Sequence, residues 1–157
     1  MKRFASVPPM EVLYTASARS SGGRNGRAHS ADSQLELQLA SPPGLGGPPH
    51  ALGVTNPEEL LAMGWSACFL TALSVLARRQ RLSPDRFEIA ARVMLGRESD
   101  GTFRLAAELD GRLPGVEREQ ARALMRSTHE LCPYSAATRG NIDVLLLVDG
   151  HPCHSAE

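Results

Sequence analysis

Alternating apolar and polar residues near the start of the chain predict two β-strands. Residues 12–18 (VLYTASA) and 33–39 (SQLELQL) carry this pattern, and in the second segment three leucines alternate with polar side chains. The segment SSGGRNGR between them contains three glycines and an Asn-Gly pair, which favour a turn. Residues 41–53 hold four prolines and four glycines and therefore predict a loop.

The next pattern predicts one long apolar helix, from Asn56 to about Arg79. Asn56 is a suitable N-cap residue, Pro57 suits the first helical position, and two glutamates follow in the first turn. Residues 60–77 contain no charged side chain, a length at the lower limit for a membrane span. The serines and threonine within this run, and the strand patterns around it, favour instead a helix buried in a core or a subunit interface. We therefore expect no membrane attachment.

Three further elements complete the predicted fold. Residues 87–95 and 103–109 alternate in hydrophobicity around GRESDG and predict an antiparallel hairpin. Apolar residues recur at helical spacing over residues 116–131, and Pro133 ends that helix because the residue before a proline disfavours the α conformation. The apolar run IDVLLLV, residues 142–148, predicts a buried strand. This order of elements predicts an α+β fold of mainly antiparallel sheets around the long apolar helix.

Length and charge narrow the class of protein. The 157 residues predict a single domain, residues 10–149, between flexible tails at residues 1–9 and 150–157. The 17 basic residues balance 17 acidic ones, which argues against a nucleic-acid partner. The first residues have no apolar stretch typical of a secretory signal, and three cysteines are too few for a secreted disulfide framework. We therefore expect a cytoplasmic protein.

The three cysteines are candidates for chemistry, although each also has a structural explanation. Cys68 lies within the apolar helix and Cys132 at the end of the second helix, and spacing alone favours packing roles for both. Cys153 lies in the C-terminal tail between two histidines. Three potential ligands in such a tail are more often incidental than a metal site.

Three longer motifs, taken in order, resemble a known family. GGRNGR, TNPEELLAMGWSACF and CPYSAATRGNIDV are similar to segments of the organic hydroperoxide resistance proteins of the osmotically inducible protein C (OsmC) superfamily. The likeness extends over about residues 12–148, and CPYSAATRGNI points to the hydroperoxide resistance branch. Val54, Trp65 and Ala136 depart from the residues expected there, and none of these departures removes a reacting group.

The resemblance implies a thiol peroxidase that forms an intertwined homodimer. Cys68 would attack the distal oxygen of an organic hydroperoxide and become a sulfenic acid, which Cys132 would resolve as a disulfide. Reduction by a lipoyl dithiol on a partner protein is likewise implied. The sequence has no haem, flavin or metal motif, so we expect sulfur alone to carry the electrons, with no cofactor or metal. The charge-free helix independently favours a dimer, because one small domain can hardly cover all of its sides.

Arg24 and Glu58 match the family's motifs, although by themselves they fit a solvated turn residue and an acid of a helix's first turn. Arg24 would supply the cation that favours the Cys68 thiolate in its apolar helix, and Glu58 would pair with the arginine. Glu58 and Cys68 stand ten residues apart, which is about 15 Å along a straight helix. A shared site therefore requires a break in the helix, which we expect at Gly64.

Apolar residues next to both cysteines predict an apolar approach to the thiolate, lined by Trp65, Phe69, Leu70, Leu131 and Tyr134. Such an approach favours long-chain hydroperoxides over hydrogen peroxide, by at least ~100-fold in kcat/KM. The alternative to an enzyme is a redox sensor or binding module, in which the cysteine pair would switch an interaction. A structural protein with inert cysteines is the third hypothesis.

Overall fold

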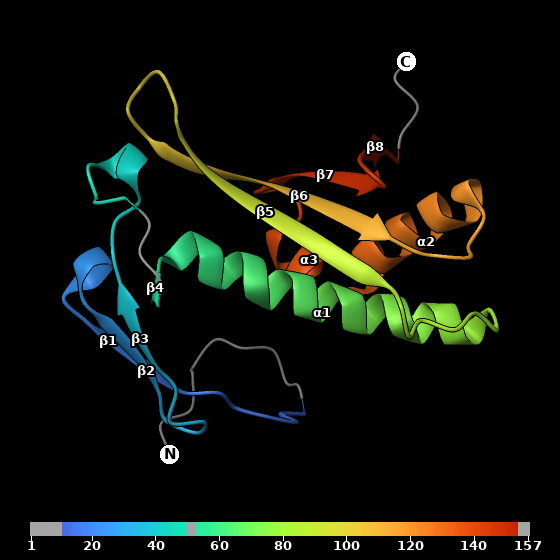
Figure 1. Cartoon of the computed structure of the whole chain (residues 1–157), viewed down its shortest axis with the longest axis horizontal. Helices are drawn as coiled ribbons and strands as arrows, with labels where there is room; N and C mark the ends of the chain where they lie inside the picture. The colour runs from blue at the N-terminus through green and yellow to red at the C-terminus, as the bar shows by residue number, and fades with distance from the viewer. Residues whose placement is uncertain (1–10, 50–52, 154–157) are drawn as a thin grey trace. The chain divides into compact units, whose positions relative to one another are not determined.

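The chain forms two compact units, seen in a computed structural model that describes residues 11–49 and 53–153 (Figure 1). The first unit extends to Asn56 and the second begins at Pro57, whereas the sequence predicted one domain. The expected N-terminal tail, residues 1–9, lies outside the described residues.

The N-terminal unit contains a mixed sheet of four short strands in the order β1-β2-β3-β4. β1, β2 and β3 pair antiparallel, and β4 pairs parallel to β3. Two short 3₁₀ turns, η1 and η2, lie between strands of this unit. The bounds are β1 Ala18–Ser21, η1 Gly23–Asn25, β2 Arg27–Ser30, β3 Glu36–Leu39, η2 Pro43–Leu45 and β4 Val54–Thr55.

The predicted strand over residues 12–18 is wrong, and the strand β2 was not predicted. The first strand begins only at Ala18, whose pairing partner is Ser30, and the described residues before it are exposed. Alternation alone does not make a strand, because the backbone needs a neighbouring strand to receive its hydrogen bonds. The strand predicted over residues 33–39 is confirmed in its second half by β3.

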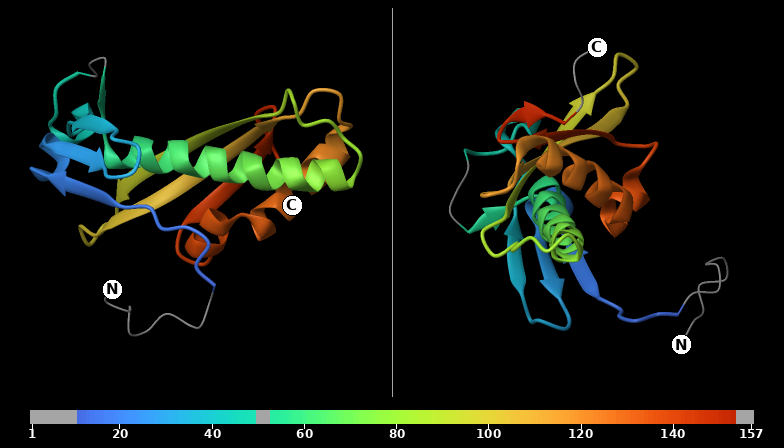
Figure 2. Two further views of the ribbon diagram at one scale, coloured as in Figure 1. Left: turned by 90° about the horizontal axis from the view of Figure 1, so that it is seen from below. Right: turned by 90° about the vertical axis from the view of Figure 1, so that its right-hand side faces the viewer.

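The C-terminal unit is a four-stranded sheet with helices on one face. The strands follow the order β5-β6-β7-β8, and α1 and α2 lie side by side beneath them (Figure 2). The predicted α+β class is confirmed, although each sheet also contains one parallel pair, β3–β4 and β6–β7. The bounds are α1 Pro57–Arg79, β5 Glu88–Arg97, β6 Phe103–Arg112, α2 Arg118–Leu131, α3 Pro133–Thr138, β7 Asp143–Val148 and β8 His151–Pro152.

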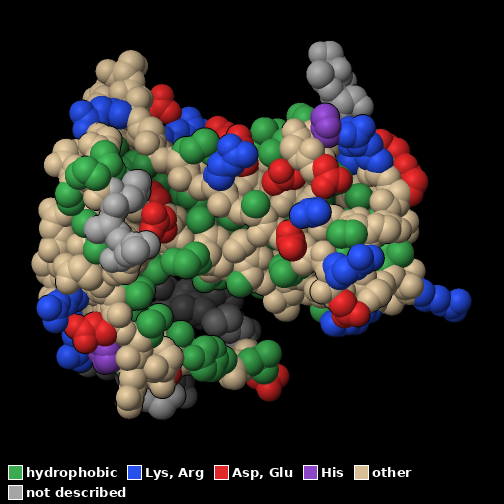
Figure 3. Space-filling view, viewed as in Figure 1, with side chains coloured by type: hydrophobic (Ala, Val, Ile, Leu, Met, Phe, Trp, Pro, Cys, Tyr) green, Lys and Arg blue, Asp and Glu red, His purple; other side chains and the backbone are tan. Residues whose placement is uncertain are grey.

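The β5–β6 hairpin forms as predicted, and its outward positions carry cross-strand ion pairs. Arg92 and Glu108 are register partners 3.2 Å apart, and Glu88 and Arg112, also partners, approach to 3.9 Å. Charged side chains of both signs are accordingly interspersed on this face (Figure 3). Such exposed pairs contribute little stability, about 0–1 kcal/mol each. They agree with the balanced net charge of the chain.

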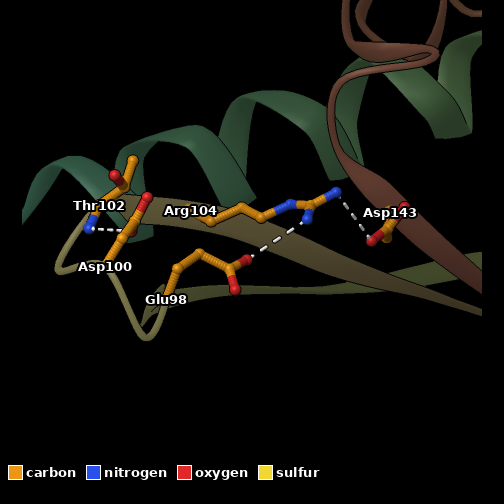
Figure 4. Close-up of polar contacts among 5 residues, drawn as sticks. All are labelled: Glu98, Asp100, Thr102, Arg104 and Asp143. Atoms are coloured by element: carbon orange, nitrogen blue, oxygen red, sulfur yellow. Dashed lines mark hydrogen bonds and ion pairs between the residues drawn. The ribbon is translucent and has the colours of Figure 1, made fainter.

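Arg104 links the turn end of this hairpin to the beginning of β7. Its guanidinium lies 3.3 Å from Glu98 and 3.4 Å from Asp143, between the two carboxylates (Figure 4). The turn itself is closed by Asp100, whose carboxylate accepts the backbone N–H of Thr102 at 2.8 Å. These exposed contacts support the parallel pairing of β6 with β7 and leave the opposite face of the sheet to the helices.

α1 packs one face into the core of the C-terminal unit. Trp65, Phe69, Leu73 and Ala77, spaced by four residues, are fully buried. By length and composition alone, α1 is apolar enough to cross a membrane, and 28% of its apolar window is buried in the chain. The opposite face is exposed along a second row of the same spacing, Met63, Ala67, Thr71 and Val75.

The break expected at Gly64 is not present, because α1 runs as one helix from Pro57 to Arg79. The glycine has a different role here. A Cβ atom at Gly64 would lie 3.2 Å from Cε2 and 3.3 Å from the hydroxyl oxygen of Tyr134. The missing side chain therefore admits the Tyr134 ring against the helix and does not bend it.

The flexible tail expected from residue 150 is wrong over its first residues. β8 pairs with β7, the Asp110 carboxylate accepts the Gly150 N–H at 3.1 Å, and Arg126 donates to the Cys153 carbonyl at 2.7 Å. Cys153 is only 4% exposed, and burial raises the pKa of its thiol. This cysteine is therefore a packed residue of the core, and residues 154–157 lie outside the described residues.

Candidate active site

Cys68 and Cys132 meet in the folded chain although 64 positions separate them. Their sulfur atoms lie 3.6 Å apart, within hydrogen-bonding distance of each other. Cys132 is fully buried, whereas Cys68 is partly exposed. Of the two thiols, Cys68 is therefore the one that an external reactant can reach, and Cys132 stands behind it.

Cys132 occupies the corner at which α2 ends and α3 begins. Its backbone is extended, with φ −66° and ψ 125°, as expected for a residue that precedes a proline. Its N–H donates to Thr128 at 2.8 Å, and its carbonyl accepts the N–H of Ala136 at 2.9 Å. The local sequence Cys-Pro thus ends one helix, starts the next, and holds the thiol between them against the middle of α1.

The surroundings of Cys68 favour its protonated form. Burial raises the pKa of the Cys68 thiol above its ordinary value, and the contact with Cys132 raises this pKa further. The backbone N–H of Tyr134 acts in the opposite direction, because it donates a hydrogen bond that favours the thiolate. A nucleophilic thiolate at neutral pH therefore requires an additional positive charge.

The residues predicted to line an apolar approach to Cys68 differ in their exposure. Trp65 and Phe69 are fully buried and face the core, so they do not line an entrance. Leu131 and Tyr134 are 46% and 41% exposed, and Leu70 is half-buried. The apolar surface open to a substrate near the two cysteines is thus smaller than the sequence suggested.

A residue that the sequence did not single out joins α1 to α3 beside the cysteines. The Trp65 Nε1–H donates to the Ser135 hydroxyl at 3.2 Å, and both side chains are fully buried. Ser135 stands within the motif CPYSAATRGNI, so its position was visible. Its partner was not, because nothing local in the sequence connects residue 65 with residue 135.

Arg24 lies in a glycine-rich loop of the N-terminal unit that is tightly fixed. Arg24 belongs to η1 and is half-buried. Gly22 has a left-handed φ of 72°, and a Cβ at Gly26 would lie 1.8 Å from the Ser21 carbonyl oxygen, so no other residue fits there. The Asn25 side chain accepts the backbone N–H of residue 41 at 2.9 Å. The glycines and this hydrogen bond therefore define the conformation of the loop within its unit.

Glu58 lies in the first turn of α1, ten residues before Cys68. Because the helix is unbroken, the two residues are about 15 Å apart along its axis. The break that the predicted site of Arg24, Glu58 and Cys68 required is therefore absent, and that site does not form along one chain's α1. Among the described residues, no group of three or more His, Cys, Asp or Glu side chains has the arrangement of a metal site.

Comparison with known proteins agrees with this arrangement of the fold. The model of the OsmC-like protein family matches residues 50–146. An organic hydroperoxide resistance protein of Xanthomonas axonopodis pv. citri is 42% identical over 139 residues, covering 88% of this chain and 96% of that protein. The chain belongs to the OsmC-like family.

Further relatives identify the branch of the family. The organic hydroperoxide resistance protein OhrA of Bacillus subtilis is 41% identical over 142 residues, covering 88% of this chain and 97% of that protein. The crystal structure of an organic hydroperoxide resistance protein of Legionella pneumophila superposes with a TM-score of 0.80 at 40% identity, covering 88% of this chain and 98% of that one. Within the OsmC-like family, the chain belongs with the organic hydroperoxide resistance proteins.

Proposed function

We propose that this protein reduces organic hydroperoxides to alcohols and so takes part in the defence against oxidative stress. The observation that carries the proposal is the 3.6 Å separation of the Cys68 and Cys132 sulfur atoms, one partly exposed and the other buried. The names of the relatives, organic hydroperoxide resistance proteins, support the substrate class.

In the proposed reaction two thiols supply two electrons to the peroxide bond. The Cys68 thiolate attacks the distal oxygen of ROOH, the O–O bond breaks, and the alkoxide leaves and takes up a proton to give ROH. The Cys68 sulfenic acid then loses water as the Cys132 thiol attacks its sulfur, which forms the Cys68–Cys132 disulfide. An external dithiol reduces this disulfide, and the family resemblance suggests a lipoyl group on a partner protein in the cytoplasm.

Arg24 and Glu58 are proposed to stabilise the thiolate across the interface of a homodimer. The pKa of Cys68 is raised by burial, so a guanidinium is needed to lower it. Within one chain the unbroken helix keeps Glu58 distant from Cys68. A two-fold axis brings unlike positions of two copies together. Antiparallel α1 helices that cross near Met63, midway between these positions, would bring Glu58 beside the partner's Cys68.

The surfaces of both units support such a dimer. Met63 on α1 is 55% exposed, and the neighbouring Ser66 and Thr71 hydroxyls donate to carbonyls of their own helix, so they need no other partner. In the N-terminal unit, Leu39 is the one apolar side chain that is buried among the residues described there. A unit with so small a core requires contacts beyond itself, which a second copy would supply.

Single-turnover oxidation tests the proposed function. The fully reduced protein is mixed with one equivalent of cumene hydroperoxide, and both the alcohol and the protein mass are measured. The wild type should yield one alcohol and one Cys68–Cys132 disulfide, Cys132→Ser should yield the alcohol and stop at the sulfenic acid, and Cys68→Ser should yield neither. Cys153→Ser serves as the matched control, because that thiol is buried elsewhere in the core.

Steady-state turnover separates the enzyme from the redox sensor. An enzyme consumes many equivalents of hydroperoxide when a dithiol such as dihydrolipoamide is supplied. A sensor is oxidised once, and its disulfide is reduced too slowly to sustain consumption. Loss of turnover in Cys153→Ser equal to that in Cys132→Ser would mean that the resolving thiol is wrongly assigned.

A further inference from the structure

We propose that the hydrogen bond between Trp65 and Ser135 positions Cys132 for disulfide formation and thereby protects Cys68 from over-oxidation. The inference rests on the proposed peroxidase reaction and assigns roles to two residues outside the reacting pair. Both side chains are fully buried, and their 3.2 Å hydrogen bond connects α1 to α3. Neither residue contacts the peroxide in this scheme, so both are positioning residues.

The placement of the two residues follows that of the cysteines. Trp65 lies three residues before Cys68, and Ser135 lies three residues after Cys132. Within α1, the three residues from Trp65 to Cys68 correspond to about 4.5 Å along the helix and to nearly the same face. Ser135 lies in the first turn of α3, which begins directly after Cys132. The sulfur contact and the hydrogen bond are therefore neighbouring links between the same parts of the chain. A movement of α3 that separates Cys132 from Cys68 must also pull Ser135 from the indole.

The indole makes this link resistant to displacement. The Trp65 Nε1–H is a donor only and is buried, so an indole without its acceptor would lose a hydrogen bond with no water to replace it. A second contact secures the same region, because the Tyr134 ring fills the space left by Gly64 on α1. Ser135, in the first turn of α3, is thus held against the buried indole of Trp65.

Precise placement matters most after Cys68 has been oxidised. A disulfide bond is about 2.05 Å long, so the sulfurs must approach by about 1.5 Å from their separation in the reduced protein. The sulfenic acid has a competing fate, in which a second ROOH oxidises it to the sulfinic acid and is itself reduced to ROH. Attack by Cys132 is intramolecular and depends on geometry, whereas the second oxidation depends on peroxide concentration.

The competition between disulfide formation and over-oxidation of Cys68 can be used to measure how well Cys132 is positioned. Reduced protein is exposed to increasing cumene hydroperoxide, and mass spectrometry gives the fractions with a disulfide and with a sulfinic acid at Cys68. The peroxide concentration at which the two fractions are equal is the ratio of the two rate constants. Trp65→Phe and Ser135→Ala should each lower that concentration about tenfold, since an ångström of misplacement can cost more than this. The rate constant of the first oxidation should change less than about twofold, because Cys68 itself is retained.

Two further variants separate positioning from loss of stability. The double variant Trp65→Phe/Ser135→Ala should resemble either single variant, because one hydrogen bond is removed in all three. Thr128→Val is the matched control, since its buried hydroxyl bonds at 2.7 Å to Leu124 within α2 and does not link two helices. Thr128→Val should lower the unfolding temperature. It should leave unchanged the peroxide concentration at which the disulfide and sulfinic acid fractions are equal.

The outcomes distinguish this inference from the proposed function. Unchanged partitioning in Trp65→Phe, which keeps an aromatic ring and is the variant least prone to misfold, would overturn the inference. An equal shift in Thr128→Val would also overturn it, because any loss of a buried hydrogen bond would then suffice. Failure of the proposed function is seen separately, as a wild-type protein in which hydroperoxide forms neither product at Cys68.

Discussion

Replacing Tyr134 with alanine should weaken the reaction with alkyl hydroperoxides and spare that with hydrogen peroxide. The Tyr134 ring lies against Gly64, one turn of α1 before Cys68, and the backbone N–H of Tyr134 donates to the Cys68 thiolate. Tyr134 is 41% exposed, so its side chain offers apolar surface to a substrate that approaches the sulfur. The substitution removes the ring and retains the N–H.

The size of the effect follows from the exposed area of the ring. A tyrosine side chain has about 200 Å² of surface, and its exposed 41% therefore amounts to roughly 80 Å². An alkyl chain that covers half of this area also buries a similar area of its own, so about 80 Å² leaves water in total. At about 25 cal/mol per Å², this is worth about 2 kcal/mol, or roughly 30-fold in kcat/KM. Hydrogen peroxide has no alkyl chain, and its rate constant should change less than about threefold.

Stopped-flow oxidation of the reduced protein measures these rate constants directly. Trp65 is the single tryptophan of the chain and lies three residues from Cys68, so its fluorescence is a suitable signal. Phe103→Ala is the control, because Phe103 is a 54% exposed ring that lies 4.7 Å from the Arg97 guanidinium at the hairpin. Equal losses for cumene hydroperoxide and hydrogen peroxide, or unchanged selectivity in Tyr134→Ala, would refute the reasoning.

Three further predictions concern the dimer, the thiolate and the helix. Met63→Glu places a charge on the exposed face of α1 and should shift the protein from dimer to monomer. Sedimentation at micromolar concentration measures this shift, and a wild type that is already monomeric would contradict the proposed dimer. Arg24→Gln should move the pH profile of the second-order rate constant for hydroperoxide to higher pH. Burial raises the pKa of the Cys68 thiol, and without the guanidinium only the Tyr134 N–H opposes this rise. Coincident profiles for wild type and variant would remove Arg24 from the site. Gly64→Ala should raise the unfolding temperature by about 2 °C. The higher helix propensity of alanine contributes up to about 1 kcal/mol, while the Tyr134 ring shifts slightly to admit the new Cβ atom. A lower unfolding temperature would show that the ring cannot move.

The β5–β6 hairpin and the helices α1 and α2 could be predicted from the sequence, because the repeat of buried positions along a strand or helix involves only neighbouring residues. Alternation over the β5–β6 hairpin and helical spacing along α2 each give a continuous buried face, and both elements lie close to the predicted ranges. The charge-free run of residues 60–77 and the helix-start residues before it likewise predicted the extent of α1. The resemblance of the two cysteine motifs to the family singled out both thiols of the proposed reaction, whereas their spacing alone favoured inert packing residues.

The tertiary structure decided whatever depends on partners distant in the chain. The first strand was predicted at residues 12–18, but it lies at Ala18–Ser21, where it pairs with β2. Residues 151–152, predicted as part of a tail, form β8, which pairs with β7. At Gly64 the sequence suggested a break, but the Tyr134 ring from α3 occupies the space beside an unbroken helix. The 3.6 Å contact of Cys68 with Cys132 and the hydrogen bond of the Trp65 indole likewise join segments more than 60 residues apart. Periodicity records which face of an element is buried, and only packing determines which distant residue lies against it.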